Sequence, residues 1–254
     1  MPAKNLEAME TLISLLDVLG KDTHEQCIRS LSKNIGASKS TVHRMLQELS
    51  SKSWAYQDID SKNYYIGLSF LCFADEWRRN LPIIKLIDSE LHDLAKKSGQ
   101  TITLSVLHKE KALCIHRIDA PRVLRIASRV GNEYPLYAGA SGKTVLACSD
   151  RKLKENIISG KLTSFTPYTV TDPDILKKQL SSIYANKYCL SSEEIDAGIS
   201  AMATPIFYSS KRLAFVVTMS GAHYEIVRNE DSYKKLLMQS AKLIQLKIAS
   251  ASLN

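Results

Sequence analysis

The stretch that decides the fold is residues 29–51, RSLSKNIGASKSTVHRMLQELSS. Apolar residues recur at spacings of three and four on both sides of Gly36, a pattern typical of two short amphipathic helices. Gly36 stands where a glycine ends a helix, and the hydroxyl of Ser38 can accept a hydrogen bond from a free backbone N–H of the next helix. The stretch therefore predicts a helix-turn-helix, whose second helix can lie in the major groove of DNA.

The face of the second helix that lies outside its apolar stripe is polar and basic. Arg44 could form two hydrogen bonds with guanine, and Gln47 could pair with adenine. Residues 38–41 stand at the helix start, where free N–H groups and the helix dipole favour phosphate. Residues 29–52 hold five basic side chains and one acidic one, a balance of +4, although a two-helix corner with a solvated charged face is the alternative. The predicted DNA-binding residues are Arg29, Ser38, Lys39, Ser40, Thr41, His43, Arg44, Gln47 and Lys62.

The overall charge is a weaker argument for DNA binding than the local cluster. The net charge is +8, but residues 1–80 contain ten basic and ten acidic residues, so the whole surplus lies in the rest of the chain. With 254 residues, 44% of them hydrophobic and 24% charged, the chain has an ordinary globular composition and is long enough for two domains.

The cysteines and the apolar runs indicate a cytoplasmic protein. Five cysteines are scattered without a CxxC pair, which argues against a disulfide framework or a structural zinc site and fits free thiols in a reducing compartment. The N-terminal residues lack the features of a signal peptide, and no apolar run approaches the ~20 residues of a membrane span. We therefore expect no membrane association.

The chain on either side of the helix-turn-helix completes a winged domain over residues 1–67. A helix over 5–19 precedes the motif, and two aromatic-rich runs around a polar turn at 59–63 predict a β-hairpin, with Lys62 at its tip. Residues 68–80 predict a linker helix whose large apolar side chains cover too much of its circumference for one core stripe. This helix packs either on the wing domain and a second subunit, or between two domains of one chain.

Residues 81–254 predict an α+β domain with a mainly antiparallel sheet flanked by helices. We expect a first helix over 82–97, strands near 101–107, 112–118, 123–130, 188–192, 201–207 and 213–220, and helices near 144–148, 150–160, 172–186 and 229–251. Gly139 to Lys143 form a loop of small residues entering a helix, which is either an anion site or simply a tight turn. Two runs with small hydroxyl residues, 191–194 and 218–221, could help to bind a small polar acid.

Catalytic and cofactor motifs are not evident in the sequence. Ser141 lacks the G-x-S-x-G elbow of a hydrolase, and the histidines lack HExxH spacing. The adjacent acids Glu193 and Glu194 would point to opposite faces if they lay on a strand. We therefore predict neither an enzyme nor a cofactor-binding or metal-binding protein.

Three blocks of residues resemble the IclR family of bacterial transcriptional regulators, and together they extend over nearly the whole chain. The first, 38–49, resembles the recognition helix of that family. The second comprises 128–131, 135–138 and 142–147, and the third comprises 192–194, Gly198 and 203–207. The region from Cys114 to Gly142 is most similar to members that control sugar-acid degradation.

The resemblance implies a winged helix-turn-helix, a linker helix and a GAF-like effector-binding domain, assembled as a homodimer or tetramer on a palindromic operator. It also implies a small carboxylate effector held by backbone amides and hydroxyls. Many members carry an acid where Ser191 stands and a cysteine where Ala201 stands, so this pocket would be less negative; Lys187 replaces a family glycine. With the small-residue loop, the predicted effector-binding residues are Gly139, Ala140, Ser141, Ser191, Ala201, Thr218 and Ser220.

These features predict a sequence-specific DNA-binding regulator, more plausibly a repressor than an activator, of a catabolic operon controlled by a small carboxylate such as a sugar acid. The competing interpretation is a metabolite-binding or enzymatic α+β domain whose helical N-terminus docks protein rather than DNA. Salt dependence would distinguish them, because phosphate contacts make DNA binding fall steeply with salt.

Overall fold

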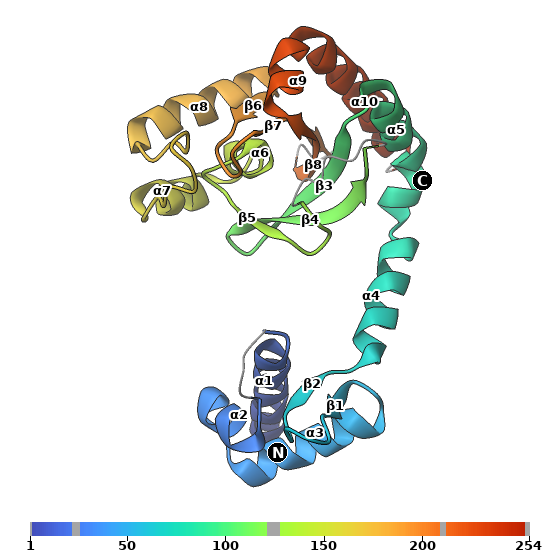
Figure 1. Ribbon diagram of the computed structural model, residues 1–254, viewed down its shortest axis with the longest axis vertical. Coiled ribbons are helices and arrows are strands. Elements are labelled where there is room, and N and C mark those ends of the chain that lie inside the picture. The colour runs from blue at the N-terminus through green and yellow to red at the C-terminus, as the bar shows by residue number, and fades with distance from the viewer. Residues whose placement is uncertain (1, 22–25, 121–127, 209–211, 252–254) are drawn as a thin grey trace. The chain divides into compact units, whose positions relative to one another are not determined.

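The computed structural model describes residues 2–21, 26–120, 128–208 and 212–251 (Figure 1). The chain forms two compact units, Met1–Asn80 and Leu81–Asn254. Most of the strand expected at 123–130 falls outside the described residues. Within the described ranges, no helix combines the length and the apolar character needed to cross a bilayer.

The first unit is a winged helix-turn-helix, as predicted. Its elements are α1 (Pro2–Leu19), α2 (Ile28–Ile35), α3 (Lys39–Ser51), β1 (Ala55–Gln57), β2 (Tyr64–Ile66) and α4 (Leu68–Asn80). The two strands pair antiparallel, and the rings of Tyr56 and Tyr65 stack across them with centroids 5.4 Å apart. The periodic apolar residues of α1, α2 and α3 meet in one core, which consists of the buried side chains Leu15, Leu19, Leu31, Val42, Leu46 and Tyr64.

Helix α4 covers the predicted linker residues and packs on the wing. The ring of Trp54 meets Phe70 edge-on, with centroids 4.6 Å apart, and lies 6.0 Å from Phe73. Other large apolar side chains of α4 stay exposed, including Leu71 and Trp77. Contact with the wing therefore accounts for only part of the apolar surface of this helix.

The second unit is an α+β domain around one antiparallel sheet, as predicted. Its elements are α5 (Pro82–Ser98), β3 (Thr101–His108), β4 (Lys111–Ile118), β5 (Glu133–Pro135), α6 (Ala140–Ala147), α7 (Arg151–Ser159), α8 (Pro173–Asn186), β6 (Cys189–Ser192), β7 (Ile199–Phe207), β8 (Leu213–Ala222), α9 (His223–Arg228) and α10 (Glu230–Ala251). The strand order is β5-β4-β3-β8-β7-β6, and every neighbouring pair is antiparallel.

The two faces of this sheet carry different layers (Figure 1). One face packs on α5 and α10, where residues such as Leu91 and Ile244 are fully buried against Met202 and Met219 of the sheet. The other face packs on α6 and α8 through a second cluster that includes Val145 and Leu180. The small, hydroxyl-bearing residues of the sheet lie on this second face, next to α6.

Some boundaries differ from the sequence-based expectation. Helix α6 begins at Ala140, whereas the sequence placed its start near residue 144, so most of the expected loop is its first turn. Gly142 lies in this first turn, and a Cβ there would overlap the carbonyl oxygen of Pro135, so only glycine fits at this position. Strand β5 and helix α9 are too short to give a periodic signal. Strand β6 ends at Ser192, where the sequence placed its end, and Glu193, with φ of 55°, and Glu194 lie beyond it.

The resemblance stated above implies a glycine at position 187, and Lys187 keeps the conformation that glycine favours. Its φ is 53° and its ψ is 31°, at the C-terminal end of α8. The ammonium group lies 3.7 Å from the centroid of the Tyr184 ring and 5.3 Å from that of Phe207. Cation–π attraction offsets part of the strain of a non-glycine residue in the left-handed region.

Candidate functional site

Helix α3 begins with a cap supplied by its own sequence. Gly36 ends α2 with φ of 69°, and the chain then turns into α3. The Oγ of Ser38 accepts a hydrogen bond from the N–H of Thr41 at 3.1 Å and lies 2.9 Å from the hydroxyls of both Ser40 and Thr41. Because Ser38 is engaged in this local cluster, its first role is to fix the start of the helix.

The polar side chains of α3 form one exposed face. Val42 and Leu46 are buried, whereas Ser40, Arg44 and Gln47 are exposed at spacings of three and four residues. The acid Glu48 pairs with Lys52 at 2.9 Å, also at the surface. Six predicted DNA-binding residues lie on α3, namely Lys39, Ser40, Thr41, His43, Arg44 and Gln47.

The remaining predicted DNA-binding residues lie on other elements of the same unit. Arg29 is exposed on α2, and Ser38 caps α3. Lys62 is exposed in the hairpin turn, with φ of 59° and its N–H donated to the carbonyl of Asp58 at 3.0 Å. The arrangement matches a winged helix-turn-helix, in which a recognition helix and a hairpin tip offer basic and polar groups to a duplex.

A pocket lies between α6 and the adjacent face of the sheet in the second unit. The strand register explains its composition, because side chains of directly opposed residues in an antiparallel pair lie on the same face. Ser191 opposes Ala201, and Ala201 opposes Ser220, so these residues form one row across β6, β7 and β8. In the next row, Thr218 opposes Thr103 of β3.

All seven residues predicted for effector binding line this pocket. Four come from the rows on β6, β7 and β8, and the other three come from the start of α6. The pocket has a volume of about 70 Å³. A pocket of that volume suits a small molecule. The binding role of the seven residues remains a prediction.

Three hydroxyl groups in the pocket wall lack a hydrogen-bond partner among the described residues. They are the hydroxyls of Ser141, Thr218 and Ser220, and all three oxygen atoms are buried. Buried polar groups in folded proteins nearly always have a partner, and an unpaired one costs about 1–3 kcal/mol. Three such groups aimed at one pocket indicate that a ligand or ordered water completes their hydrogen bonding.

The start of α6 adds backbone donors to the same pocket. Gly139 precedes the helix with φ of 76° and provides no side-chain cap. The N–H of Lys143 donates to the carbonyl of Gly139 at 3.1 Å, so the amides of Ala140, Ser141 and Gly142 precede this bond. Such N-terminal amides, together with the helix dipole, favour an anion.

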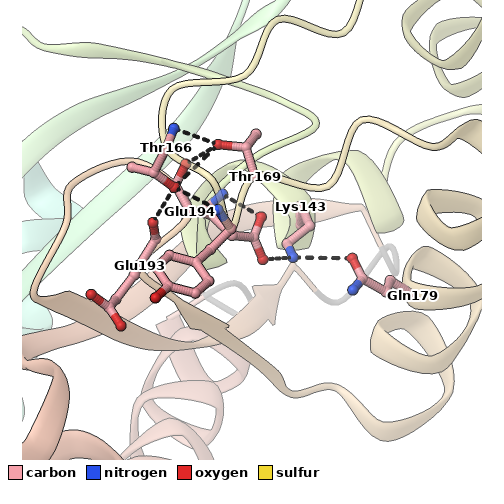
Figure 2. A network of polar contacts seen from close by, with 8 residues as sticks. Lys143, Thr166, Thr169, Gln179, Glu193 and Glu194 are labelled. Carbon is pink, nitrogen blue, oxygen red and sulfur yellow. Dashed lines mark hydrogen bonds and ion pairs between the residues drawn. The ribbon is translucent and has the colours of Figure 1, made fainter.

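A buried ion pair behind the pocket was missed by the sequence reasoning. Figure 2 shows the carboxylate of Glu194 directed at the ammonium group of Lys143. Lys143 is 1% exposed and also donates to the Oε1 of Gln179 at 3.1 Å. A buried lysine nearly always has a partner. Because Glu194 lies 51 positions from Lys143 in the sequence, no local pattern could identify it as that partner.

Other polar residues of the pocket could have been found from the sequence. Thr103 and Ser105 line it from β3, and Ser200 lines it from β7. Thr101, Thr103 and Ser105 alternate along a strand whose every second residue is apolar and buried, such as Ile102. A strand with hydroxyl groups on one face and apolar groups on the other indicates a polar site on the hydroxyl face.

The thiols of the second unit's sheet are unsuited to nucleophilic chemistry. Burial raises the pKa of Cys189 and of Cys114 to about 11, so both are protonated at neutral pH. In the described part of the chain, no cluster of three or more His, Cys, Asp or Glu residues is placed to hold a metal ion. The arrangement is that of a binding pocket.

Family profiles match both units of the chain. The profile described as "Bacterial transcriptional regulator IclR C-terminal" matches residues 77–246. The profile described as "IclR helix-turn-helix domain" matches residues 11–58. The two matches follow the same order as the two units of the structure.

Curated relatives and a solved structure agree with these profiles. The chain is 30% identical to the HTH-type transcriptional regulator KdgR of Escherichia coli over 197 aligned residues. The aligned segment covers 77% of this chain and 74% of the relative. The chain is 25% identical over 219 residues to the HTH-type transcriptional repressor AllR of the same organism, covering 86% and 81%. A crystal structure of an IclR homolog from Microbacterium hydrocarbonoxydans, complexed with 4-hydroxybenzoate, superposes with a TM-score of 0.79 at 21% identity, covering 95% and 98%.

Proposed function

Because the chain belongs to the IclR family of DNA-binding transcriptional regulators and is not an enzyme, we propose that it represses a catabolic operon until a small carboxylate binds. The observation that carries this proposal is the convergence of the α6 amides and three unpaired hydroxyls, from Ser141, Thr218 and Ser220, on one pocket. The name of the AllR relative supports repression over activation. The proposed location is the cytoplasm, where the DNA is.

For DNA recognition, we assign the bases to Arg44 and Gln47 and the phosphates to the start of α3. Both side chains are exposed on the face of α3 away from the core. Arginine binds guanine through two hydrogen bonds, and glutamine binds adenine in the same way. Arg29 and Lys62 would contact the backbone on either side, which positions the helix without reading sequence.

The proposed assembly is a homodimer, or a pair of such dimers, on a palindromic operator. Large apolar side chains are exposed on α1 at helical spacing, namely Leu6, Met9 and Ile13. Exposed apolar side chains also remain on α4, such as Leu71 and Trp77, the latter 53% exposed. A second copy would cover such surface, and two-fold symmetry would place two recognition helices on two half-sites.

The proposed effector is a small carboxylate such as a sugar acid. Backbone amides and neutral hydroxyls are sufficient to hold one carboxylate, which accepts several hydrogen bonds. The structural relative bound to 4-hydroxybenzoate, itself a small carboxylate, supports this class. The effector must bind one arrangement of the dimer more tightly than the other, because equal affinity for both would shift nothing.

Binding of the purified protein to its own upstream intergenic DNA tests this function. A panel of sugar acids and small carboxylates is added at fixed, modest salt, and the affinity for the DNA is measured. We expect specific binding with a steep salt dependence, and we expect one acid to weaken it. Specific binding that no acid alters would overturn the effector class, and absence of any DNA binding at low salt would favour the protein-docking alternative.

A further inference from the structure

The carboxyl group of Glu194 forms part of the wall of the pocket. The residue is 6% exposed and lines the pocket beside the start of α6. Its Oε2 accepts the N–H of Gly139 at 3.3 Å, and its Oε1 pairs with Lys143. Its main-chain carbonyl accepts the hydroxyl of Thr169 at 2.7 Å, which anchors the backbone as well (Figure 2).

Lys143 does not offer its charge to a ligand. Its ammonium group is occupied by Glu194 and by Gln179 (Figure 2) and is buried behind the pocket. Among the lining residues that the structure describes, none is Lys, Arg or His, whereas Glu194 and Asp196 are both acids. The donors available to an anion within this described wall are therefore neutral amides and hydroxyls.

We infer that Glu194 is a specificity-determining residue that makes the pocket select effectors with a single carboxylate, carrying hydroxyl groups, and reject dicarboxylates. This inference rests on the proposed binding of a small carboxylate. One carboxylate satisfies the amides of α6 and the unpaired hydroxyls. In a pocket of about 70 Å³, a second carboxylate would lie close to Glu194, which lines the wall, and farther from Lys143, which does not. Repulsion between the two carboxylates would therefore outweigh attraction to the ammonium group, because the interaction of charges weakens with distance. A hydroxyl in the same place would instead donate to Glu194 or Asp196.

The matched probes are glycerate and tartronate, which share a three-carbon skeleton and a 2-hydroxyl. Glycerate ends in CH₂OH where tartronate carries a second carboxylate, so at pH 7 they differ by one negative charge. Calorimetry would measure the affinity of each acid for the full-length protein. We expect wild type to bind glycerate about 10- to 50-fold more tightly than tartronate, the range that one repulsive charge pair at short distance produces.

Two variants remove the charge of Glu194. Glu194→Gln leaves Lys143 unpaired and should bind tartronate at least as tightly as glycerate. Because an unpaired buried charge destabilises the fold, the double variant Lys143→Met with Glu194→Gln removes both charges, and its affinity ratio should fall to within about threefold of unity. Circular dichroism confirms that each variant is folded.

The matched control is Glu193→Gln, one residue away. The carboxylate of Glu193 accepts the N–H of Gly198 at 2.7 Å and is not part of the pocket wall, so the ratio should stay at the wild-type value. An unchanged ratio in the folded double variant would overturn the inference and leave the proposed function intact. If neither acid binds wild type or any variant, this class of effector fails, and the inference fails with it.

Discussion

Helices α3 and α6 begin in opposite ways, and this difference separates the two functional surfaces of the protein. Helix α3 is capped by Ser38, whose Oγ accepts the N–H of Thr41. Helix α6 follows Gly139 without a side-chain cap, and its first residues lie in the wall of the pocket. When a side chain of the same segment accepts a hydrogen bond from the first N–H groups of a helix, binding to a partner is left to the exposed side chains. When those N–H groups have no such cap, they can bind a ligand themselves.

The largest expected effect comes from filling the pocket at the uncapped start of α6. Ser141→Trp should abolish the response to the effector, because an indole occupies a pocket of about 70 Å³, while DNA affinity in the absence of effector stays near wild type. The measurement is DNA affinity with and without the effector. Ser181→Trp, at an exposed position of α8, is the control and should respond normally. A normal response from Ser141→Trp would remove the start of α6 from the binding site.

The next largest effect should come from the close contact between Gly142, in the first turn of α6, and the carbonyl of Pro135. Gly142→Ala places a Cβ against the carbonyl of Pro135 and should lower the free energy of unfolding by about 3 kcal/mol. Urea unfolding of the full chain measures this change. Gly160→Ala, where the nearest atom to a Cβ would lie 3.3 Å away, should change the value by less than about 1 kcal/mol. Equal stability of the two variants would contradict this account of the α6 start.

On the capped helix, the side chains rather than the backbone should carry recognition. Arg44→Ala should weaken binding to the operator by about 1–3 kcal/mol and leave binding to random DNA nearly intact. Competition binding with both kinds of DNA gives the two values. Arg151→Ala removes a surface arginine of the second unit, on α7, and should change neither. An equal loss on operator and random DNA would make Arg44 a phosphate contact instead of a base-reading residue.

The smallest expected effect is the loss of the α3 cap. Ser38→Ala should lower the stability of α3 by about 1 kcal/mol, because the N–H of Thr41 loses its acceptor. Native-state hydrogen exchange of the amides at the start of α3 reports this change. Ser38→Asp restores an acceptor and should recover the protection while weakening DNA binding, because its charge repels phosphate. Protection that is unchanged in Ser38→Ala would show that the cap does not hold this helix.

Much of the first unit could be predicted because its signals are local. Gly36 and Ser38 mark the end of one helix and the start of the next within three positions, and Val42 and Leu46 mark the buried side of α3. The pocket needed more than local pattern. The hydroxyl runs that contain Ser191 and Ser220 were visible in the sequence, but Ala201 was anticipated only through resemblance to a family, and only strand register places the three residues in one row.

The sequence by itself determined the elements whose cause lies within a few residues. These are the capped helix-turn-helix, the aromatic hairpin and the alternation of apolar and small polar residues along the strands. Only the tertiary structure decided that Lys143 and Glu194 pair, that Gly142 must be glycine, and that α6 starts without a cap inside a pocket. Caps and periodicity act between neighbours along the chain, whereas burial of a charge or an unpaired hydroxyl depends on segments that only folding brings together.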